Sequence, residues 1–382
     1  MDPLATTREL LPLIRASRDE TETQRRIAAP VVAALRASRL CRIALPAEQG
    51  GLALPPLEAL SIYELLAGAE ASVSWIVWNN ALPSFFGRFL RPEVRAEIFA
   101  NPDALYASST RPSGRAAIED EGYRVDGRWS LVSGCELAEW LALRCRVEEN
   151  GQPRMLQPNV PEVRMVWLKR ADVRILDTWH TGGLRGTGSH DVVVENVMVP
   201  RRHTLSPADG STLAGALGRV PIVCSMAAGY AAQLLGLGAT AVDTLVELTS
   251  NKPVVDPGPA LGERPGVLAA VAEHRVRLVA AREHLHGCVA RLWRAAEERQ
   301  CGPAQIGAVF GAAHHAMAQG RGAVVAMYAL AGASALYTSS PLERAHRDLH
   351  AMAAHVIAQP GYVEDTGRVQ LGLKPLNPLY LV

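Results

Sequence analysis

The sequence predicts an α+β protein in which a helical unit, a β unit and a bundle of long helices follow one another along the chain. Apolar residues recur at helical spacing up to about residue 100, alternate with a period of two from about 104 to 204, and return to helical spacing beyond about 205. The chain has 382 residues, 48% hydrophobic and 20% charged, so it can bury a large core. We expect an N-terminal helical domain over 1–103, a central β domain over 104–204 and a C-terminal helical bundle over 205–382.

Short helices separated by turns are expected in the N-terminal unit. Leu10, Leu11 and Ile14 have the apolar spacing of one helix face. Pro and Gly residues at 45–51 and at 91–92 interrupt the pattern, because Pro forbids and Gly weakens a continued helix.

The clearest hairpin signal in the middle unit is the Asp126-Gly127 dipeptide, which favours a two-residue β-turn. Apolar residues alternate before it, at Tyr123 and Val125, and after it, at Trp129. A central antiparallel, barrel-like β unit is therefore predicted.

Long helices are expected in the C-terminal unit, where four of them would form a four-helix bundle. The segments are 220–249, 267–299, 303–336 and 341–358, with a Pro/Gly-rich connection at 252–266. The last helix has a readable start, in which Ser340 caps, Pro341 occupies the first turn and Glu343 returns a hydrogen bond to the cap.

Charge and cysteine content limit the partners and the compartment. The net charge of +1 gives no general attraction to nucleic acid or to an anionic membrane, so neither is expected as a partner. No signal peptide is visible, and six scattered cysteines without a C-x-x-C pair indicate reduced thiols in a cytoplasmic protein. The uncharged segment 220–242 is long enough to span a membrane, but its small and polar residues favour a helix buried in the bundle.

One segment resembles a dinucleotide-binding fingerprint but lies in the wrong structural context. Residues 236–241 read G-x-G-x-x-A, but they lie inside a helical segment with no strand ahead of them. Without that fold, binding of a nicotinamide cofactor is not expected.

Two segments of the β unit carry the resemblance to a family. They are Ser108–Ala116 with Trp129–Gly134, and the Gly-rich segment Trp179–Val192. With the order of the three units, they resemble the acyl-CoA dehydrogenase fold superfamily and, within it, the oxygenase components of group D two-component flavin-dependent monooxygenases. The resemblance implies an acyl-CoA dehydrogenase-like architecture, reduced FMN or FAD supplied by a separate NAD(P)H:flavin reductase, O2 as co-substrate, and a homotetramer.

The same resemblance assigns residues to the cofactor and to the substrate. Short hydroxyls and preset backbone donors suit a polar heterocycle with anionic character. The cofactor-binding residues that it implies are Thr110, Ser113, Gly114, Ser133, Gly134, Arg185, Thr187, Ser189 and Arg282. The substrate pocket that it implies contains Trp75, Trp78, Asn79 and Phe85. The alternatives are a turn serine for Ser133, core packing for the two tryptophans and an ordinary surface arginine for Arg282.

A third segment, Ser339–His355, separates two chemistries. On a continuous helix Asp348 and His355 lie seven apart along one border of the apolar face, whereas His346 and His350 lie on the other, so no metal site is expected. Acyl-CoA dehydrogenases commonly keep a glutamate base seven residues beyond the Arg-Asp pair, and here that residue is His355. Residues 211–225, the alternative place for that base, contain no Asp or Glu.

The expected catalytic residues are His355, Ser133 and Asp348, and the expected enzyme is a monooxygenase. It would hydroxylate a small electron-rich aromatic substrate through a flavin C4a-hydroperoxide, with His355, at a reference pKa of about 6.5, handling a proton near neutrality. Three alternatives stay open: a core histidine bonded to Asp348 or to a carbonyl, a dehydrogenase or oxidase with a displaced base such as Glu364 or Asp365, and a non-catalytic scaffold.

Overall fold

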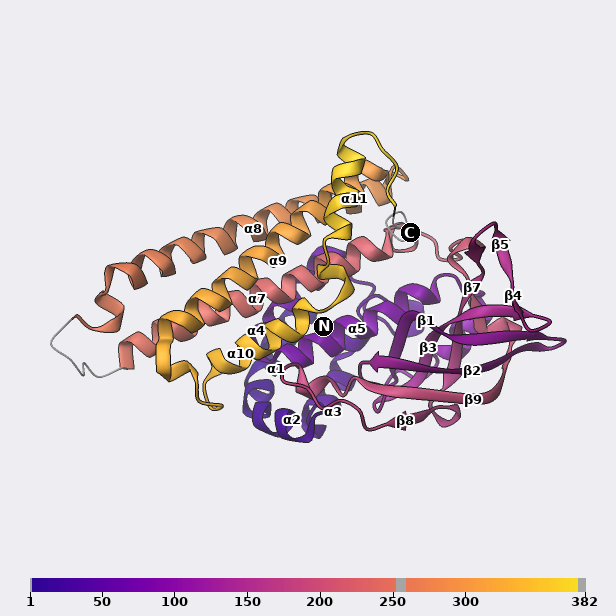
Figure 1. The fold of residues 1–382 in the computed structure, drawn as a ribbon, viewed down its shortest axis with the longest axis horizontal. Helices are drawn as coiled ribbons and strands as arrows, with labels where there is room; N and C mark the ends of the chain where they lie inside the picture. The colour runs from indigo at the N-terminus through magenta and orange to yellow at the C-terminus, as the bar shows by residue number, and fades with distance from the viewer. Residues whose placement is uncertain (1, 252–258, 377–382) are drawn as a thin grey trace.

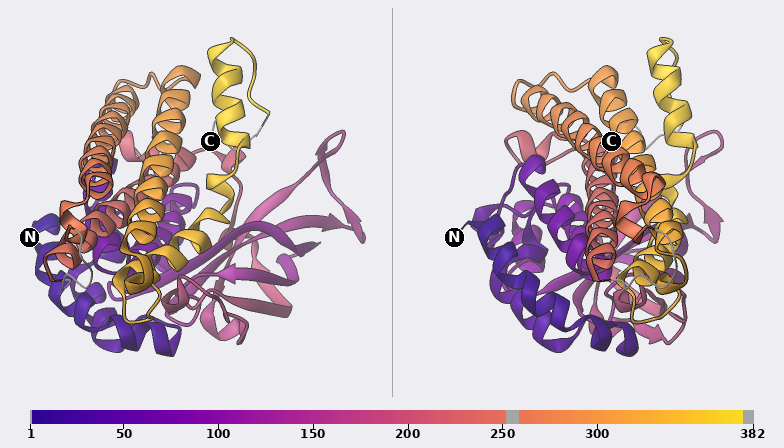
Figure 2. Two further views of the ribbon diagram at one scale, coloured as in Figure 1. Left: turned by 60° about the vertical axis from the view of Figure 1, so that its left-hand side comes forward. Right: turned by 90° about the vertical axis from the view of Figure 1, so that its left-hand side faces the viewer.

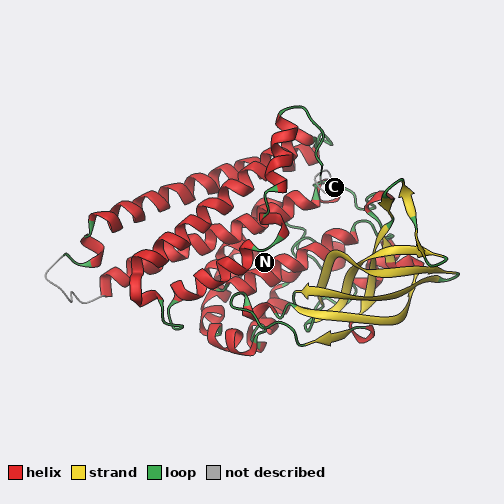
Figure 3. Ribbon diagram, in the orientation of Figure 1, coloured by secondary structure: helices red, strands yellow, loops and turns green. Residues whose placement is uncertain are grey.

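The computed structural model of the chain describes residues 2–251 and 259–376. Its helices and strands are segregated: the strands lie together at one end of the molecule and the helices occupy the rest (Figures 1 and 3). Helical, β and helical segments follow one another along the chain, which confirms the α+β class.

The N-terminal helices form wherever capping residues and prolines permit a start. They are α1 (Pro3–Ala16), α2 (Arg18–Gln24), α3 (Ala29–Ser38), α4 (Pro56–Ala69), α5 (Ala71–Gly87) and α6 (Pro92–Ile98). Asp2 caps α1 by accepting a hydrogen bond from the Leu4 N–H, and Glu70 caps α5 through the Ser72 N–H. Helix α5 is buried along most of its length.

The strands form an eight-stranded sheet and a separate β5–β6 pair within the described residues. They are β1 (Leu105–Glu119), β2 (Gly122–Val132), β3 (Ala138–Glu149), β4 (Gln152–Pro153), β5 (Met155–Gln157), β6 (Val160–Pro161), β7 (Val163–Lys169), β8 (Arg174–Leu176), β9 (His190–Pro200) and β10 (Thr204–Leu205). The main sheet has the order β10-β7-β3-β1-β2-β9-β8, with β4 paired to β3. The strand pairs are antiparallel as expected, except that β1 and β3 run parallel.

Asp126-Gly127 is not a turn. Strand β2 runs straight through it, and the tight turn lies at Asp120-Glu121, since Glu119 pairs with Gly122. The Asp126 carboxylate instead accepts a hydrogen bond from the Asn196 N–H, at a bulge in β9 where Asn196 has φ of 56°.

The C-terminal helices are close to the expected ones. They are α7 (Ile222–Asn251), α8 (Pro265–Glu297), α9 (Pro303–Ala331), α10 (Pro341–Ala353) and α11 (Gly361–Gln370). Part of the expected connection at 252–266 lies outside the described residues. Ser340 is the N-cap residue of α10, but its side chain makes no capping bond and Glu343 pairs with Arg347, so the predicted capping box was wrong.

Helix α7 is the uncharged segment. Residues 222–250 are long and apolar enough to cross a membrane, but 83% of the apolar window is buried within the protein. Gly236 packs against the α4 backbone, where an added Cβ would overlap the Glu64 carbonyl, so the glycines of the apparent fingerprint serve helix packing.

Two apolar cores hold the molecule together. The larger joins the N-terminal helices to the C-terminal bundle, with buried side chains such as Trp78 on α5 and Tyr230 on α7. The smaller lies within the sheet and includes Trp129. The left view of Figure 2 shows the strands extending away from the helices. The junction between the helices and the sheet is where the site lies.

Candidate active site

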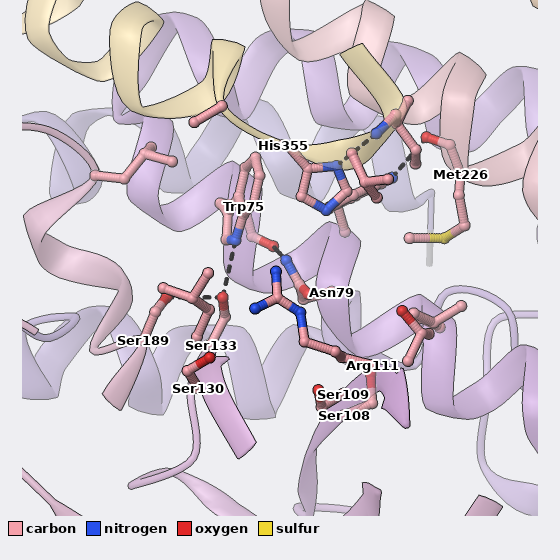
Figure 4. A pocket seen from close by; sticks show the side chains of 18 of the residues that line it. Trp75, Asn79, Ser108, Ser109, Arg111, Ser130, Ser133, Ser189, Met226 and His355 are labelled. Carbon is pink, nitrogen blue, oxygen red and sulfur yellow. Dashed lines mark hydrogen bonds between the residues drawn. The ribbon is translucent and has the colours of Figure 1, made fainter. Parts of the chain in front are cut away.

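A cavity of about 960 Å³ opens where α5, the strands, α7 and the segment after α10 meet. This volume lies within the range of ligand and cofactor sites. Figure 4 shows side chains from these elements pointing into it, among them Trp75, Ser133, Arg111 and His355.

One face of α5 forms a wall of the cavity. Trp75, Asn79, Leu82 and Phe86 succeed one another at helical spacing along this face, with Trp78 beside them. Phe85 was expected here, but it belongs to the next face of the helix and packs against a different set of residues beneath α4. The pocket therefore uses Phe86 instead.

Ser133 belongs to a chain of hydrogen bonds at the cavity wall (Figure 4). Its Oγ accepts from Trp75 Nε1 at 3.0 Å and lies 2.7 Å from Ser189 Oγ. Ser189 Oγ lies 2.7 Å from Thr187 Oγ1, which donates to the Leu184 carbonyl at 2.9 Å. Because the Thr187 hydroxyl donates its only proton to the Leu184 carbonyl, it can only accept from Ser189. Ser189 therefore donates to Thr187, and Ser133 in turn donates to Ser189. Ser133 therefore offers the cavity a lone pair, not a proton.

Several residues expected to touch the cofactor instead shape the wall. Thr110 and Ser189 line the cavity with Ser133, whereas Ser113 is exposed outside it. Gly114 packs against the Trp129 ring, which an added Cβ would overlap, and the Gly134 N–H is occupied by the Thr187 carbonyl at 2.9 Å.

Arg185 and Thr187 brace the Gly-rich segment from behind. Arg185 donates to the Thr181 carbonyl at 3.0 Å and pairs with Glu22 at 3.3 Å, and neither it nor Thr187 lines the cavity. Sequence spacing identified the correct segment but not which of its side chains face inward.

Asp348 fixes this segment to α10. Its buried carboxyl accepts from the Leu184 N–H at 2.6 Å, and Gly183 lies so close to α10 that an added Cβ would overlap the Arg347 carbonyl. Burial, followed by the neighbouring Glu70 carboxylate, raises the pKa of Asp348 to about 8. Asp348 does not line the cavity, so it is a positioning residue and not the catalytic residue expected.

His355 lines the cavity, but it does not continue the helix as expected. Helix α10 ends at Ala353, where the Met352 carbonyl accepts from the Tyr230 hydroxyl, and His355 starts a short 3-10 turn. Its ring stacks on Tyr230 with centroids 5.6 Å apart and meets Trp75 edge-on at 5.4 Å.

The expectation of a titration near neutrality was wrong for His355. Burial lowers its pKa to about 4, so the ring is neutral at pH 7. The Ile357 N–H donates to His355 Nδ1 at 3.3 Å, which leaves the ring proton on Nε2. No hydrogen bond to Asp348 is formed, because that carboxyl is engaged by Leu184.

Arg282 lies away from the cavity. It sits on α8 and makes a two-pronged ion pair with the buried Glu64 of α4. The cofactor role expected for it does not fit this placement within the chain, since its guanidinium already has a carboxylate partner.

The charges around the cavity are all positive. Of the described residues that line it, none is Asp or Glu, whereas Arg111, Arg144 and Arg347 are present. Glu364 is exposed on α11, and the Asp365 carboxyl accepts from the Leu376 N–H, so neither candidate for a displaced base reaches the cavity. No group of three or more metal-ligating side chains occurs among the described residues.

Arg111 and Arg144 were not given a role by sequence reasoning. Arg111 lay inside the flavin motif but was not distinguished from its neighbours, and Arg144 is one arginine of an ordinary strand. No sequence pattern shows that both side chains line one cavity.

Comparison with known proteins agrees with this architecture. The family described as "Acyl-CoA dehydrogenase, C-terminal domain" matches residues 228–360. The indole-3-acetate monooxygenase of Acinetobacter baumannii is 28% identical over 369 residues, 96% of this chain and 93% of that one. The FADH(2)-dependent resorcinol hydroxylase, oxygenase component, of a Rhizobium species is 28% identical over 388 residues, 95% and 92% of the two chains. The crystal structure of 3-HSA hydroxylase from Rhodococcus sp. RHA1 superimposes with a TM-score of 0.90 and 26% identity, covering 100% of this chain and 99% of that one.

The arrangement of helices, sheet and cavity is that of the acyl-CoA dehydrogenase fold, and the family match lies in the C-terminal helices. Over nearly its whole length the chain is similar to oxygenase components of flavin-dependent monooxygenases, and it is a flavin-dependent monooxygenase that uses reduced flavin and O2. The expectations for fold, enzyme class and cofactor are therefore confirmed.

Proposed function

We propose that the enzyme hydroxylates a small electron-rich aromatic compound in this cavity, using reduced flavin from a separate NAD(P)H:flavin reductase. The observation that carries the proposal is the neutral His355 in a cavity whose described lining holds no carboxylate. Removing a proton next to a thioester needs a positioned base, and the described lining offers no carboxylate for that role. Relatives named for indole-3-acetate and resorcinol support an aromatic substrate.

The described lining fits a flavin. Ser133 and Ser189 present short hydroxyl groups, and the segment 181–184 brings backbone to the same wall. When bound, reduced flavin supplies the electrons that let O2 give one oxygen atom to the substrate and one to water. The lone pair of Ser133 suits a ligand N–H, and the flavin N5 carries a hydrogen only when the flavin is reduced. The hydroxyl chain thus favours the reduced cofactor.

His355 acts here as a hydrogen-bond donor. Its Nδ1 is occupied by the Ile357 N–H, so only the Nε2–H is free to serve a ligand. A neutral donor stabilises developing negative charge on a reacting oxygen without itself changing protonation state. This role replaces the proton exchange near pH 6.5 that its reference pKa suggested.

The aromatic walls keep water from the reacting groups. Trp75 and Trp78 pack with centroids 5.1 Å apart, and both meet the His355 ring edge-on. Such walls offer an arene stacking partners and lower the local dielectric, which strengthens the hydrogen bonds inside.

Anaerobic mixing tests the function. We expect no reduction of bound oxidised flavin by candidate aromatics, and hydroxylated product only with reduced flavin and O2. Replacing His355 with Ala should divert oxygen to peroxide and lower the yield of product per flavin consumed. Bleaching of oxidised flavin by substrate would instead favour a dehydrogenase, and failure to bind either redox state would favour a scaffold.

We also propose a homotetramer. Helix α8 carries exposed apolar side chains on one face, with Leu268 57%, Val276 69% and Val279 54% exposed. An apolar stripe of this kind on a long helix needs a partner surface.

A further inference from the structure

Two arginines without a carboxylate partner share one side of the cavity. Arg111 and Arg144 both line it, and neither forms an ion pair with any described residue. Arg347, the third arginine of the lining, is by contrast neutralised by Glu22 and Glu343. Cations that face a cavity without a counter-ion are expected to meet an anionic ligand there.

A bulge in β1 aims Arg111 inward. In the parallel pairing of β1 with β3, Ser109 faces Leu143 and Gly114 faces Cys145, so residues 110–113 of β1 oppose Arg144 alone. The extra residues loop out of the sheet, and Arg111 points from this loop into the cavity (Figure 4). Bulges next to active sites commonly re-aim a side chain in this way.

The bulge also brings the two arginines together. Arg144 Nη1 lies 3.5 Å from the carbonyl of Thr110, the residue before Arg111. Trp129 Nε1 donates to the Arg144 carbonyl at 2.8 Å and its ring packs on Gly114, so the base of the bulge is fixed. Burial lowers the pKa of Arg144, which is the sign of a cation lacking compensation.

An apolar row adjoins the arginines. Arg144 pairs across the sheet with Met165, and Met165 pairs with Leu205, so the three side chains stand on one face of the sheet, and all three line the cavity. Across from them, α5 contributes Leu82 and Phe86. A phosphate and its polar chain would need several donors, whereas a cationic end beside an apolar slot suits an aryl group with a short acidic side chain.

We propose that Arg111 and Arg144 bind a carboxylate of the substrate, so that the enzyme oxygenates an aromatic acid. This inference rests on the proposed hydroxylase function and adds to it the chemical class of the substrate. Arg111 is exposed and forms no hydrogen bond or ion pair with another described residue, whereas Arg144 is half-buried, so Arg111 carries most of the selectivity.

Binding under anaerobic conditions tests the proposal without turnover. Indole-3-acetate and 3-hydroxybenzoate are compared with their neutral amides, indole-3-acetamide and 3-hydroxybenzamide, in the presence and absence of reduced FMN. We expect at least one acid to bind roughly 10- to 100-fold more tightly than its amide, as charge-assisted hydrogen bonds allow. In Arg111→Gln the acid and amide should bind about equally, and Arg111→Lys should keep part of the preference.

The matched control is Arg115→Gln. Arg115 lies on the same strand, is exposed outside the cavity and pairs with Asp126 and Glu148, so its loss should leave the preference unchanged. The proposal would be overturned if the amides bound as tightly as the acids. It would also be overturned if none of the four compounds bound.

Two further outcomes show whether the arginines bind the flavin or a substrate carboxylate. If Arg111→Gln weakens the binding of reduced FMN tenfold and keeps the preference for the acid over its amide, the arginines bind the flavin and the proposal is wrong. If wild type binds neither flavin redox state, the hydroxylase function fails, while an acid preference in the flavin-free protein would still stand.

Discussion

A histidine that is neutral and already accepts a hydrogen bond at one ring nitrogen has only the opposite N–H to give a ligand. His355 is such a residue, enclosed by Trp75, Trp78 and Tyr230 and bonded at Nδ1 to the Ile357 N–H. Its place along the chain was predicted correctly, but its protonation was not, because burial is a property of the packed structure.

The pH dependence of product yield tests this state of His355. With a folded pKa of about 4, the ring stays neutral from pH 5.5 to 7.5, so product per flavin consumed should be constant across that window. His355→Gln, which keeps an N–H donor, should retain more product than His355→Leu, with a gap of roughly tenfold for one lost hydrogen bond to a charged oxygen. An inflection near pH 6.5 that disappears in His355→Gln would show a titrating base instead.

The hydroxyl chain gives a second prediction at a single residue. Thr187→Val removes the acceptor that fixes the direction of the Ser189 and Ser133 protons, so Ser133 becomes able to donate to the cavity. We expect the preference for reduced over oxidised flavin to fall by roughly 3- to 10-fold. Anaerobic titrations with both redox states measure it.

The control for that variant is Thr181→Val. Thr181 also lines the cavity, but its hydroxyl donates to the Gly183 carbonyl and takes no part in the hydrogen bonds that link Thr187, Ser189 and Ser133. Its loss should change the affinity for both redox states alike. An unchanged preference in Thr187→Val would contradict the assigned direction of the protons.

Among the elements, the bulged strand β1 carries both a packing constraint and a functional side chain. Gly114 closes the bulge against the Trp129 ring, where a methyl group has no room. Gly114→Ala should therefore lower the free energy of unfolding by about 1–3 kcal/mol, as overpacking does, and should also weaken acid binding because Arg111 shifts. Denaturant melts and the binding assay measure both effects.

Gly266→Ala is the matched control. Gly266 is exposed in the first turn of α8, and an added Cβ meets nothing within 4 Å. Its replacement should leave stability unchanged or raise it by up to about 1 kcal/mol through helix propensity. Equal stability for the two variants would argue against the Trp129 contact.

The contact between α10 and the Gly-rich segment predicts a pH effect on stability. The folded pKa of Asp348 is raised to about 8 from an ordinary value of 3.8, so between these values the folded state holds a proton that the unfolded state has lost. The stability associated with this group is thus present below pH 4 and is lost as the pH rises to 8. Asp348→Asn, which stays neutral, should lose less stability than wild type between pH 5 and 8 in urea melts. An equal dependence of the free energy of unfolding on pH in the two proteins would contradict the raised pKa of Asp348.

Sequence reasoning located the elements better than the inward-facing residues. Periodicity gave the long helices nearly to their ends, because an amphipathic face repeats along many turns. It missed the end of α10 at Ala353, where the Met352 carbonyl accepts a hydrogen bond from the Tyr230 hydroxyl of a distant helix. It chose Phe85 over Phe86, a difference of one residue that rotates a side chain by about 100° around the helix. Arg144 carried no signal, because its importance arises from pairing between strands.

For the whole molecule, the exposed apolar face of α8 predicts assembly. Val276→Glu should place a charge in the subunit contact and shift the protein from a tetramer toward smaller species in light scattering. Leu13→Glu, an exposed apolar position on α1, is the control and should not change the mass. A monomer in wild type would contradict the proposed tetramer.

The cavity wall draws on regions far apart in sequence, namely α5, the strands and the Gly-rich segment between residues 108 and 205, the start of α7, and residues 346–362. Residues 346–362 are translated after the other regions, so the cavity cannot be complete until they have been added. A chain that stops before His355 would therefore lack both one wall of the cavity and the histidine that faces it.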